Sequence, residues 1–493
     1  MFRKNENGRH YDYESLDSDN SKKLTIFFAT LCVIDLFGVF PIVTLPKALI
    51  SCGYYALPLI LLVFSLQTYT AVVLGRCWMI AEKLDPSIMN KSRYAYAAIG
   101  EMTFGQPMKH FVTILLDLTV FGAGIPNLLV ASQNLQLLGL RITNGSFDFS
   151  FCYFLIIIGL FLCPIMWLGS PKNMRILASI SVTICTTVAI LTWICIFKES
   201  EEKAVTPIEV FDPSNPPLLN LLKAYGIISF QFDIHPMLLT IQVDMQDKNK
   251  IGKAVFSGLM TTCTLSIITT LLVHWTYGQE ITANVLESLP RSWTLYLIIM
   301  LVTLQLCLSS AVGNSALFQH VEDAMNISSH FNFKRCIIRS IFVWLAVLLG
   351  ELIPKFDLVM GVIGGTLTGP LVFILPPLFY TKMLKLEKRF DKRMFESSPL
   401  ADFNDTESLL KSSLYGTINS PVRRIKGYNP KAAIKKAYYF LHSECVLSSL
   451  VISFGVAATL TSTFYNFLDI KSLDEFWSPC IQNISLSYEL IPR

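Results

Sequence analysis

The segment 229–239, SFQFDIHPMLL, places an acid and a histidine inside an otherwise apolar run. A carboxylate can hold a cation or a proton, and an imidazole changes charge near physiological pH, so Asp233 and His235 could carry ion-coupled chemistry. The following Pro236 lacks an N–H, and its ring would clash with the carbonyl of Phe232 in a continuous helix. We therefore expect the helix to open between Phe232 and Pro236.

The stretch VIDLFGVFPIVTLPKAL near the N-terminus contains a second interruption, made by Asp35, Gly38, Pro41 and Pro46. An opened helix frees backbone groups that lipid cannot satisfy, so it must line a cavity or be buried in protein. An acid at mid-membrane costs about 2.5–3.5 kcal/mol on insertion scales. That cost favours contact of Asp35 and Asp233 with an ion, a proton or a substrate over simple packing, with a structural pair between either acid and Lys47 as the alternative.

The elements that must position these residues are membrane helices. Of the 493 residues, 52% are hydrophobic and only 15% are charged, against about 25% charged in a typical soluble protein. Apolar runs of around 20 residues, long enough to cross a bilayer, recur along the chain. They predict an all-α multi-pass membrane protein of about eleven transmembrane helices, at 24–46, 55–78, 110–139, 151–169, 176–197, 217–243, 254–276, 292–318, 336–353, 357–384 and 437–462.

The positive residues predict the orientation of these spans. Most of the 40 Lys and Arg residues fall in the tail and loops on one side, which is expected to be cytosolic. An uncleaved first span then leaves the N-terminus cytosolic and the C-terminus on the outer or luminal side. The small net charge of +4 implies no nucleic acid as a partner; the partner implied by the spans is the lipid bilayer.

The two interrupted spans are the first and the sixth, which indicates two five-span halves related as an inverted repeat. The substrate would lie where the broken helices meet, with half-helix N-termini able to bind a carboxylate. Proline also occurs in other spans, so the pattern alone does not decide the architecture. The predicted parts are a cytosolic tail (1–23), repeat one (24–197), repeat two (217–384), a disordered cytosolic loop (385–436), span eleven (437–462) and an outer tail (463–493).

Five stretches of the sequence resemble the amino acid/auxin permease family. They are TLPKALISCGYYALPLILLVFSLQTYTAVVLGRCW (44–78), YAAIGEMTFG (96–105), WLGSPKNMRILASIS (167–181), FQFDIHPMLLTIQVDMQDKNKIGKAV (230–255) and IPKFDLVMGVIGGTLTGPLVFILPPLFYTK (353–382). The resemblance covers roughly residues 24–384 and is closest to proton-coupled and vesicular inhibitory amino acid transporters. It implies a LeuT-like fold of 5+5 inverted repeats with broken helices one and six, and secondary transport of amino acids driven by protons or sodium.

The sequence departs from that family in span one. Val39, Phe40 and Pro41 stand where a Gly-x-Gly stretch is usual, and Lys47 stands where an aromatic residue is common. Glycine lets a small substrate approach the backbone. The loss therefore leaves a second hypothesis open, in which the chain is an amino acid sensor that retains the transporter fold without transporting.

The candidate site residues follow from the two interruptions and their neighbours. For His235, proton coupling competes with a neutral histidine bonded to the opened backbone, and for Asn127 and Asn314, a role in the site competes with helix-to-helix packing. The expected substrate-binding residues are Asp35, Gly38, Val39, Phe40, Asn127, Ser229, Phe230 and Asp233, and the expected coupling residues are His235, Asp233 and Asn314. No catalytic, metal or cofactor site is expected, since none of the 12 cysteines has metal-ligand spacing.

Short motifs bear on location. YESL (13–16) and DTESLL (405–410) fit sorting signals and favour an endosomal, lysosomal or vesicular membrane over the plasma membrane. Of five Asn-x-Ser/Thr sequons, only Asn144 and Asn483 fall on the predicted outer side, where glycans are added. A disulfide among Cys52, Cys152 and Cys480 is also possible there, and the basic residues of the loop 385–436 could touch anionic lipid or simply be solvated.

Overall fold

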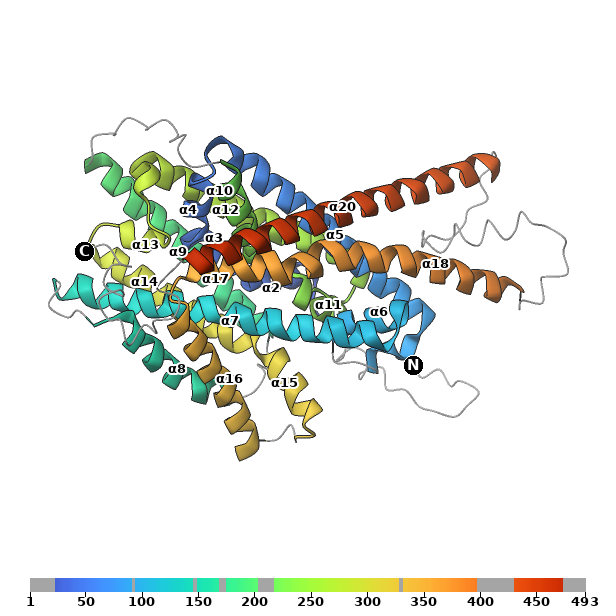
Figure 1. Ribbon diagram of the computed structural model, residues 1–493, viewed down its shortest axis with the longest axis horizontal. Coiled ribbons are helices and arrows are strands. Elements are labelled where there is room, and N and C mark those ends of the chain that lie inside the picture. Colours follow the sequence, from blue (N-terminus) through green and yellow to red (C-terminus); the bar gives the residue numbers. More distant parts are fainter. Residues whose placement is uncertain are drawn as a thin grey trace, which may run out of the picture.

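The computed structural model describes residues 23–90, 94–144, 149–167, 174–202, 217–327, 331–396 and 430–472. Across these ranges the protein is helical (Figure 1), with a single β-bridge between Leu24 and Met245. The predicted all-α class is confirmed. Asn483, Cys480 and both sorting motifs lie outside the described residues.

The N-terminal half contains α2 to α9. Their bounds are α2 Ile26–Phe37, α3 Phe40–Val43, α4 Leu45–Ile50, α5 Ala56–Leu84, α6 Ala95–Phe104, α7 Gln106–Ile142, α8 Phe151–Trp167 and α9 Met174–Glu202. The C-terminal half continues with α10 Pro217–Gln231, α11 His235–Asp244, α12 Ile251–Tyr277, α13 Val285–Ser288, α14 Trp293–Gly313, α15 Ser315–Ala324, α16 Phe333–Leu352, α17 Phe356–Ile363, the π-helical turns η5 Gly364–Thr368 and η6 Pro370–Ile374, α18 Leu375–Glu396 and α20 Pro430–Ser472.

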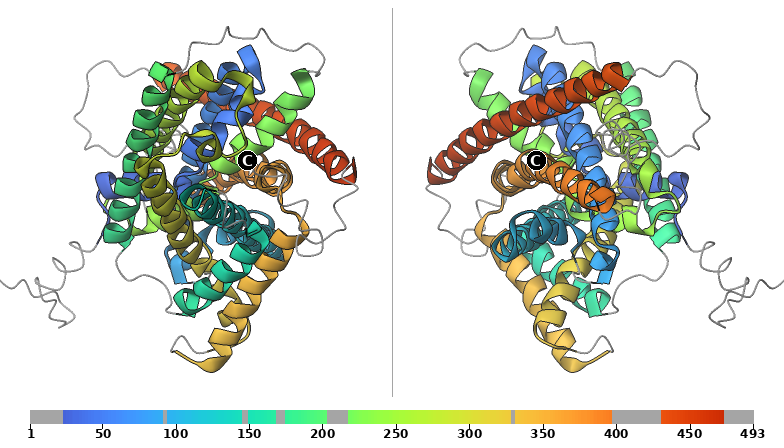
Figure 2. Two further views of the ribbon diagram at one scale, coloured as in Figure 1. Left: turned by 90° about the vertical axis from the view of Figure 1, so that its left-hand side faces the viewer. Right: turned by 90° about the vertical axis from the view of Figure 1, so that its right-hand side faces the viewer.

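Many of these helices could lie in a bilayer. Within the described residues, seven helical stretches are long and apolar enough to cross one, and the shorter apolar helices include Ile26–Phe37 and Phe151–Trp167. The helices pack into one bundle, with α20 along one side and α15 and α16 along the opposite side (Figure 2). The count of eleven spans and the inverted repeat remain predictions.

The helix opening predicted at 229–239 is present. Helix α10 ends at Gln231, and α11 begins at His235 with Pro236 in its first turn. A proline is tolerated there because the first N–H groups of a helix have no intrahelical partner. The segment between the two helices therefore exposes backbone groups inside the bundle.

The first interruption is made by glycine as well as by proline. Helix α2 ends at Phe37, and Gly38 adopts φ 58°, a conformation that side chains disfavour. A Cβ atom on Gly38 would lie 2.7 Å from the Nε2 atom of Gln305. Pro41 then falls in the first turn of α3, so the chain resumes its helix after only Gly38 and Val39.

A third interruption was not expected. Helix α14 ends at Gly313 and α15 begins at Ser315, so Asn314 divides the predicted span 292–318. The Nδ2 atom of Asn314 donates to the carbonyl of Ser310 at 2.9 Å. A side chain that bonds the preceding turn offers the backbone an alternative to the helical ladder.

The loop predicted to be disordered at 385–436 is partly helical, so that prediction is wrong over 385–396 and over 430–436, where α20 begins. Helix α18 continues to Glu396 and extends beyond most of the bundle beside α5 (Figure 1). The Nζ atom of Lys83 on α5 lies 2.9 Å from Glu387 and 3.0 Å from Asp391. These contacts give the extension a surface to pack on, which a disordered loop would lack. Residues 397–429 lie outside the described part.

Glycine holds α10 and η5, two elements of the second half of the chain, close together. A Cβ atom on Gly364 would lie 1.8 Å from the carbonyl oxygen of Gly226, so α10 and η5 touch backbone to backbone. Only a residue without a side chain permits that approach. The contact brings Thr368 of η5 beside the opened segment after α10.

Two of the three cysteines considered for a disulfide, Cys52 and Cys152, lie in the described residues. Cys152 at the start of α8 is disulfide-bonded, whereas Cys52 is buried and free. Most of the other described cysteines are buried and free as well, as small apolar residues would be.

Candidate functional site

A cavity of about 140 Å³ lies between the interrupted helices. Its walls come from α2 and α3, from α7, from the segment joining α10 to α11, and from α14 with Asn314. Two carboxyl groups, Asp35 and Asp233, line it, and no Lys, Arg or His is among its lining residues in the described part of the chain. The polar residues that line it are Asp35, Thr119, Asn127, Gln231, Asp233, Gln305, Ser309, Ser310 and Asn314.

Most of the predicted site residues meet at this cavity, and three do not. Those that line it are Asp35, Gly38, Phe40, Asn127, Phe230, Asp233 and Asn314. Val39 is buried in the apolar core instead. Ser229 and His235 are fully buried next to the cavity without lining it.

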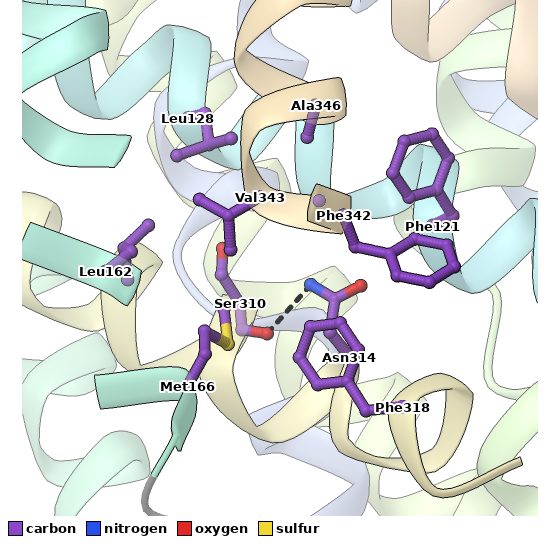
Figure 3. A pocket seen from close by; sticks show the side chains of 11 residues that line it. Phe121, Leu128, Leu162, Met166, Ser310, Asn314, Phe318, Phe342, Val343 and Ala346 are labelled. Carbon is purple, nitrogen blue, oxygen red and sulfur yellow. Dashed lines mark hydrogen bonds between the residues drawn. The ribbon is translucent and has the colours of Figure 1, made fainter. Parts of the chain in front are cut away.

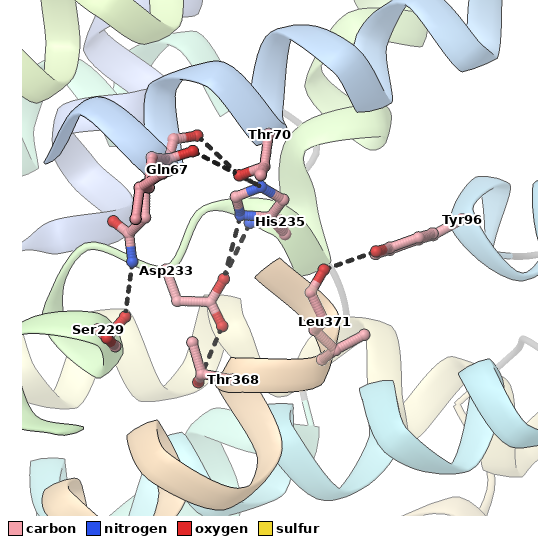
Figure 4. Close-up of polar contacts among 9 residues, drawn as sticks. Gln67, Thr70, Tyr96, Ser229, Asp233, His235, Thr368 and Leu371 are labelled. Atoms are coloured by element: carbon pink, nitrogen blue, oxygen red, sulfur yellow. Dashed lines mark hydrogen bonds and ion pairs between the residues drawn. The ribbon is translucent and has the colours of Figure 1, made fainter. Parts of the chain in front are cut away.

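Asp233 lines the cavity and also hydrogen-bonds to the elements around it (Figure 4). Its Oδ1 atom accepts a hydrogen bond from the backbone N–H of His235 at 3.1 Å. Its Oδ2 atom accepts one from the hydroxyl of Thr368 on η5 at 3.2 Å. The carboxyl group therefore sits at the N-terminus of α11, where the helix dipole favours negative charge.

His235 lies behind Asp233, away from the cavity. Its Nδ1 atom is 3.6 Å from Oδ1 of Asp233, and its Nε2 atom is 3.0 Å from the hydroxyl of Thr70 on α5. The side chain is wholly buried. The imidazole therefore lies between an acid that faces the cavity and a hydroxyl that does not (Figure 4).

Further polar contacts fix the opened segment to neighbouring helices. Gln67 on α5 donates to the carbonyl of Ser229 at 3.0 Å, and Gln231 donates to the hydroxyl of Thr44 at 2.8 Å. Both carbonyl and hydroxyl groups would be costly to bury without partners. Ser229 was predicted to bind the substrate; its carbonyl instead accepts from Gln67, and the residue does not line the cavity.

A second polar group surrounds the first break. The hydroxyl of Ser181 on α9 hydrogen-bonds Asp35 and accepts from Nε2 of Gln305 at 3.3 Å. Gln305 is 1% exposed, and its Oε1 atom has no hydrogen-bond partner among the described residues. An unpartnered buried acceptor beside an acid is an arrangement that a bound cation or ammonium group would satisfy.

Asn127 and Asn314 meet through α14. The Nδ2 atom of Asn127 donates to the hydroxyl of Ser310 at 3.0 Å. Ser310 and Asn314 also border a second, smaller cavity of about 20 Å³ between α7, α8, α14 and α16 (Figure 3). A space of that size holds a single water molecule.

The candidate residues predicted from the sequence leave out several polar residues of the site. Gln305, Thr119 and Ser181 were not predicted, although each is a polar residue within an apolar run. The position of Gln305 could have been suspected because amides are costly in lipid. Nothing in the sequence alone places it against Gly38.

The predicted glycan sites are only partly described. Asn144 is exposed just after α7, with φ 56°, and its side-chain oxygen accepts from Arg291. Asn483 lies outside the described residues. No group of three or more His, Cys, Asp or Glu side chains is placed to hold a metal ion in the described ranges.

Comparisons with known proteins match this chain to amino acid transporters. The family model described as "Transmembrane amino acid transporter protein" matches residues 22–401. The Arabidopsis thaliana amino acid transporter AVT1J is 24% identical over 78% of this chain and 89% of that protein. The Arabidopsis thaliana amino acid transporter AVT1I is 22% identical over 76% of this chain and 89% of that protein.

Solved transporter structures also align. MhsT in complex with L-phenylalanine matches with 11% identity and a TM-score of 0.49, over 87% of this chain and 98% of that chain. A manganese transporter from Eremococcus coleocola matches with 12% identity and a TM-score of 0.44, over 94% and 97%. The family match covers most of the sequence, including both broken helices and the cavity between them, and the chain therefore belongs to the transmembrane amino acid transporter family, the amino acid/auxin permease family.

Proposed function

We propose that this chain is a secondary active transporter that carries a small amino acid together with a proton or a sodium ion. The observation that carries the proposal is the cavity between two helix breaks, with one carboxyl group from each break in its wall. Family membership supplies amino acids as the substrate class. The breaks supply the substrate position, since discontinuous helices form the binding site in transporters of this architecture.

The cavity volume favours a small substrate. Its 140 Å³ is close to an engineered protein cavity of about 150 Å³ that binds benzene. Benzene has as many non-hydrogen atoms as alanine. A larger amino acid would require the helices around Phe40, Phe230 and Met237 to move outwards.

The two acids of the cavity favour one orientation of a bound amino acid. Its ammonium group would pair with Asp35 or Asp233, the acids in the wall. Its carboxylate would take hydrogen bonds from uncharged donors such as Asn127, Gln231 and Ser309. The N-terminus of α11, predicted to bind that carboxylate, is instead bonded by Asp233 itself, so that role passes to the amides.

The same two acids explain why a coupling cation would be needed. One ammonium group can neutralise one of the two acids, so the other needs a proton or a metal cation to avoid a buried unpaired charge. The Asp233–His235 pair, 3.6 Å apart, is suited to a proton. Asp35 with the unpartnered oxygen of Gln305 is suited to sodium, because hard cations prefer oxygen ligands.

Uptake into proteoliposomes tests the function. Labelled small amino acids would be offered with a pH gradient and a sodium gradient imposed separately. We expect concentrative uptake with one gradient, abolished by collapsing it. Binding of an amino acid without any flux under either gradient would contradict the proposal.

A sensor that kept the fold is the second candidate function. The first break spans only Gly38 and Val39 before α3 begins, and Val39 is buried. Fewer opened backbone groups are therefore available than in a break with two glycines. Saturable amino acid binding by the purified chain, with no counterflow in vesicles, would favour this function.

The proposed location is an endosomal, lysosomal or vesicular membrane, with the N-terminus in the cytosol. The disulfide-bonded Cys152 supports placing the start of α8 on the oxidising side. Changing Asn90, Asn144, Asn326, Asn404 and Asn483 to Gln one at a time, and reading gel shifts, tests the orientation. A glycan on Asn90, Asn326 or Asn404 would contradict it.

A further inference from the structure

On the extension of α18, basic and acidic side chains lie on different faces of the helix. Its exposed basic side chains recur at the spacing of one helix face. This basic stripe consists of Lys385, Lys388, Arg389, Lys392 and Arg393. An exposed charged run is ordinarily just a solvated face, so the opposite face decides whether the stripe has a further role.

Two acidic residues of the same helix point the other way. Glu387 and Asp391 both contact Lys83 on α5, at 2.9 and 3.0 Å, and Met383 is buried. Lys83 thus neutralises the two acids that lie between the ends of the stripe. The basic side chains of the stripe are exposed on the other face of the helix.

The stripe begins where α18 leaves the apolar part of the bundle. Phe379 and Tyr380 are buried, and the ammonium group of Lys382 lies 5.3 Å from the centre of the Phe104 ring. From Lys385 to Arg393 the helix rises about 12 Å. That distance spans the polar layer of one leaflet, roughly 5–8 Å thick, and stays within a Debye length of it.

We propose that the basic stripe binds the headgroups of anionic phospholipids in the adjoining leaflet. The helix that carries the stripe is continuous with an apolar stretch able to cross the bilayer, so the stripe meets headgroups wherever the protein is embedded. Clustered Lys and Arg next to a membrane helix attract such lipids electrostatically. The inference stands apart from transport, since it requires only that the chain sit in a bilayer.

The test measures lipid selectivity around the full-length protein. The chain is reconstituted in phosphatidylcholine bilayers with spin-labelled phosphatidylserine or spin-labelled phosphatidylcholine. The motionally restricted fraction in the paramagnetic resonance spectrum gives the relative association constant of the two lipids. The test variant carries Lys385→Gln, Lys388→Gln, Arg389→Gln and Arg393→Gln.

The matched control removes the same number of charges from exposed lysines on the same predicted side. It carries Lys23→Gln, Lys250→Gln, Lys253→Gln and Lys334→Gln. We expect the association constant for phosphatidylserine relative to phosphatidylcholine to be about five times higher in wild type and control than in the test variant. The difference should vanish near 1 M salt, where the Debye length is about 3 Å.

Several outcomes would overturn the proposal. Equal loss of selectivity in the two variants would assign it to the whole positive side rather than to the stripe. Unchanged selectivity in the test variant, with loss of binding to a soluble acidic peptide, would make a protein the occupant. Should the test variant melt earlier than wild type, the salt titration of the wild-type protein decides, and salt-independent selectivity would contradict the stripe.

Discussion

The two helix breaks that border the cavity are built by different means. At the first, between α2 and α3, one backbone conformation makes the turn, since Gly38 has φ 58° and Gln305 fills the space where a side chain would go. At the second, between α10 and α11, a polar network makes it, through Asp233, His235 and their partners on α5 and η5. The first is fixed by sterics and the second by hydrogen bonds.

The difference implies that the first break is rigid and that the second can respond to protonation. A steric break responds to volume and hardly to protonation, whereas a network containing an acid and an imidazole changes its hydrogen bonds when a proton arrives. We therefore infer that the first break holds the substrate position and the second responds to the driving ion.

Gly38→Ala should destabilise the fold most. The positive φ costs an alanine about 1 kcal/mol or more, and the 2.7 Å approach to Gln305 adds overpacking of about 1–3 kcal/mol. We expect a marked fall in melting temperature in detergent and loss of uptake. Adding Gln305→Ala should restore part of the stability by removing the clash.

The matched control for this substitution is Gly313→Ala at the third interruption. A Cβ atom there would meet nothing within 4 Å, and the residue has no positive φ. Its melting temperature should stay within a degree or so of wild type, or rise slightly through helix propensity. Equal destabilisation by both substitutions would show that glycine at breaks matters generally and that the steric fit at Gly38 does not.

The breaks themselves could be predicted, and their construction could not. Pro236 and Pro41 are local signals, because a proline constrains its own turn wherever it lies. The packing of Gln305 on Gly38, the hydroxyl of Thr368 at Asp233 and the division of the span at Asn314 depend on helices far apart in sequence. Such contacts leave no periodic trace in the sequence. The sequence therefore predicts the acids of the cavity, but it also puts Val39 and Ser229, which do not line the cavity, among the substrate-binding residues.

Asp233→Asn should have the next largest effect, on accumulation rather than on folding. The amide oxygen can still accept from the N–H of His235, and Thr368 can rotate its hydroxyl to accept from the amide. The fold should therefore survive, while the charge that faces the cavity is lost. We expect concentrative uptake to fall about tenfold or more, the scale of one charge-assisted contact.

Asp35→Asn is the companion substitution at the steric break. If the division of roles holds, it should weaken substrate affinity and leave the dependence of uptake on the pH gradient unchanged. Measuring concentration dependence at two gradient strengths separates the two effects. Loss of the pH response in Asp35→Asn, with its retention in Asp233→Asn, would reverse the assignment of the breaks.

His235→Gln should have a more selective effect, because it should spare substrate exchange. Its side chain does not line the cavity, and glutamine keeps a hydrogen-bonding group within reach of Thr70. Exchange of labelled for unlabelled substrate should stay within about twofold of wild type, while accumulation driven by a pH gradient should be lost. A normal pH response in both His235→Gln and Asp233→Asn would mean that neither titrates during transport.

Glu287→Gln should leave transport nearly unchanged while altering stability. Glu287 lies on α13, and Arg141 donates to its backbone carbonyl at 2.8 Å, away from both breaks. Burial raises the pKa of Glu287 from 4.5 to about 8, opposed by Arg141 and assisted by Asp357. Below 4.5 both folded and unfolded forms hold the proton, so the group contributes nothing to the pH dependence.

Between pH 4.5 and about 8 the unfolded chain releases this proton and the folded one retains it, so the free energy of unfolding falls as pH rises. By pH 8 the loss is on the order of a few kcal/mol. Glutamine does not titrate, so the melting temperature of Glu287→Gln should gain on wild type from pH 5 to pH 8. The exposed neighbour Glu280→Gln should show no such gain. A pH-driven uptake that changed with Glu287→Gln would place part of the proton response outside the second break, and the division between the two breaks would then be incomplete.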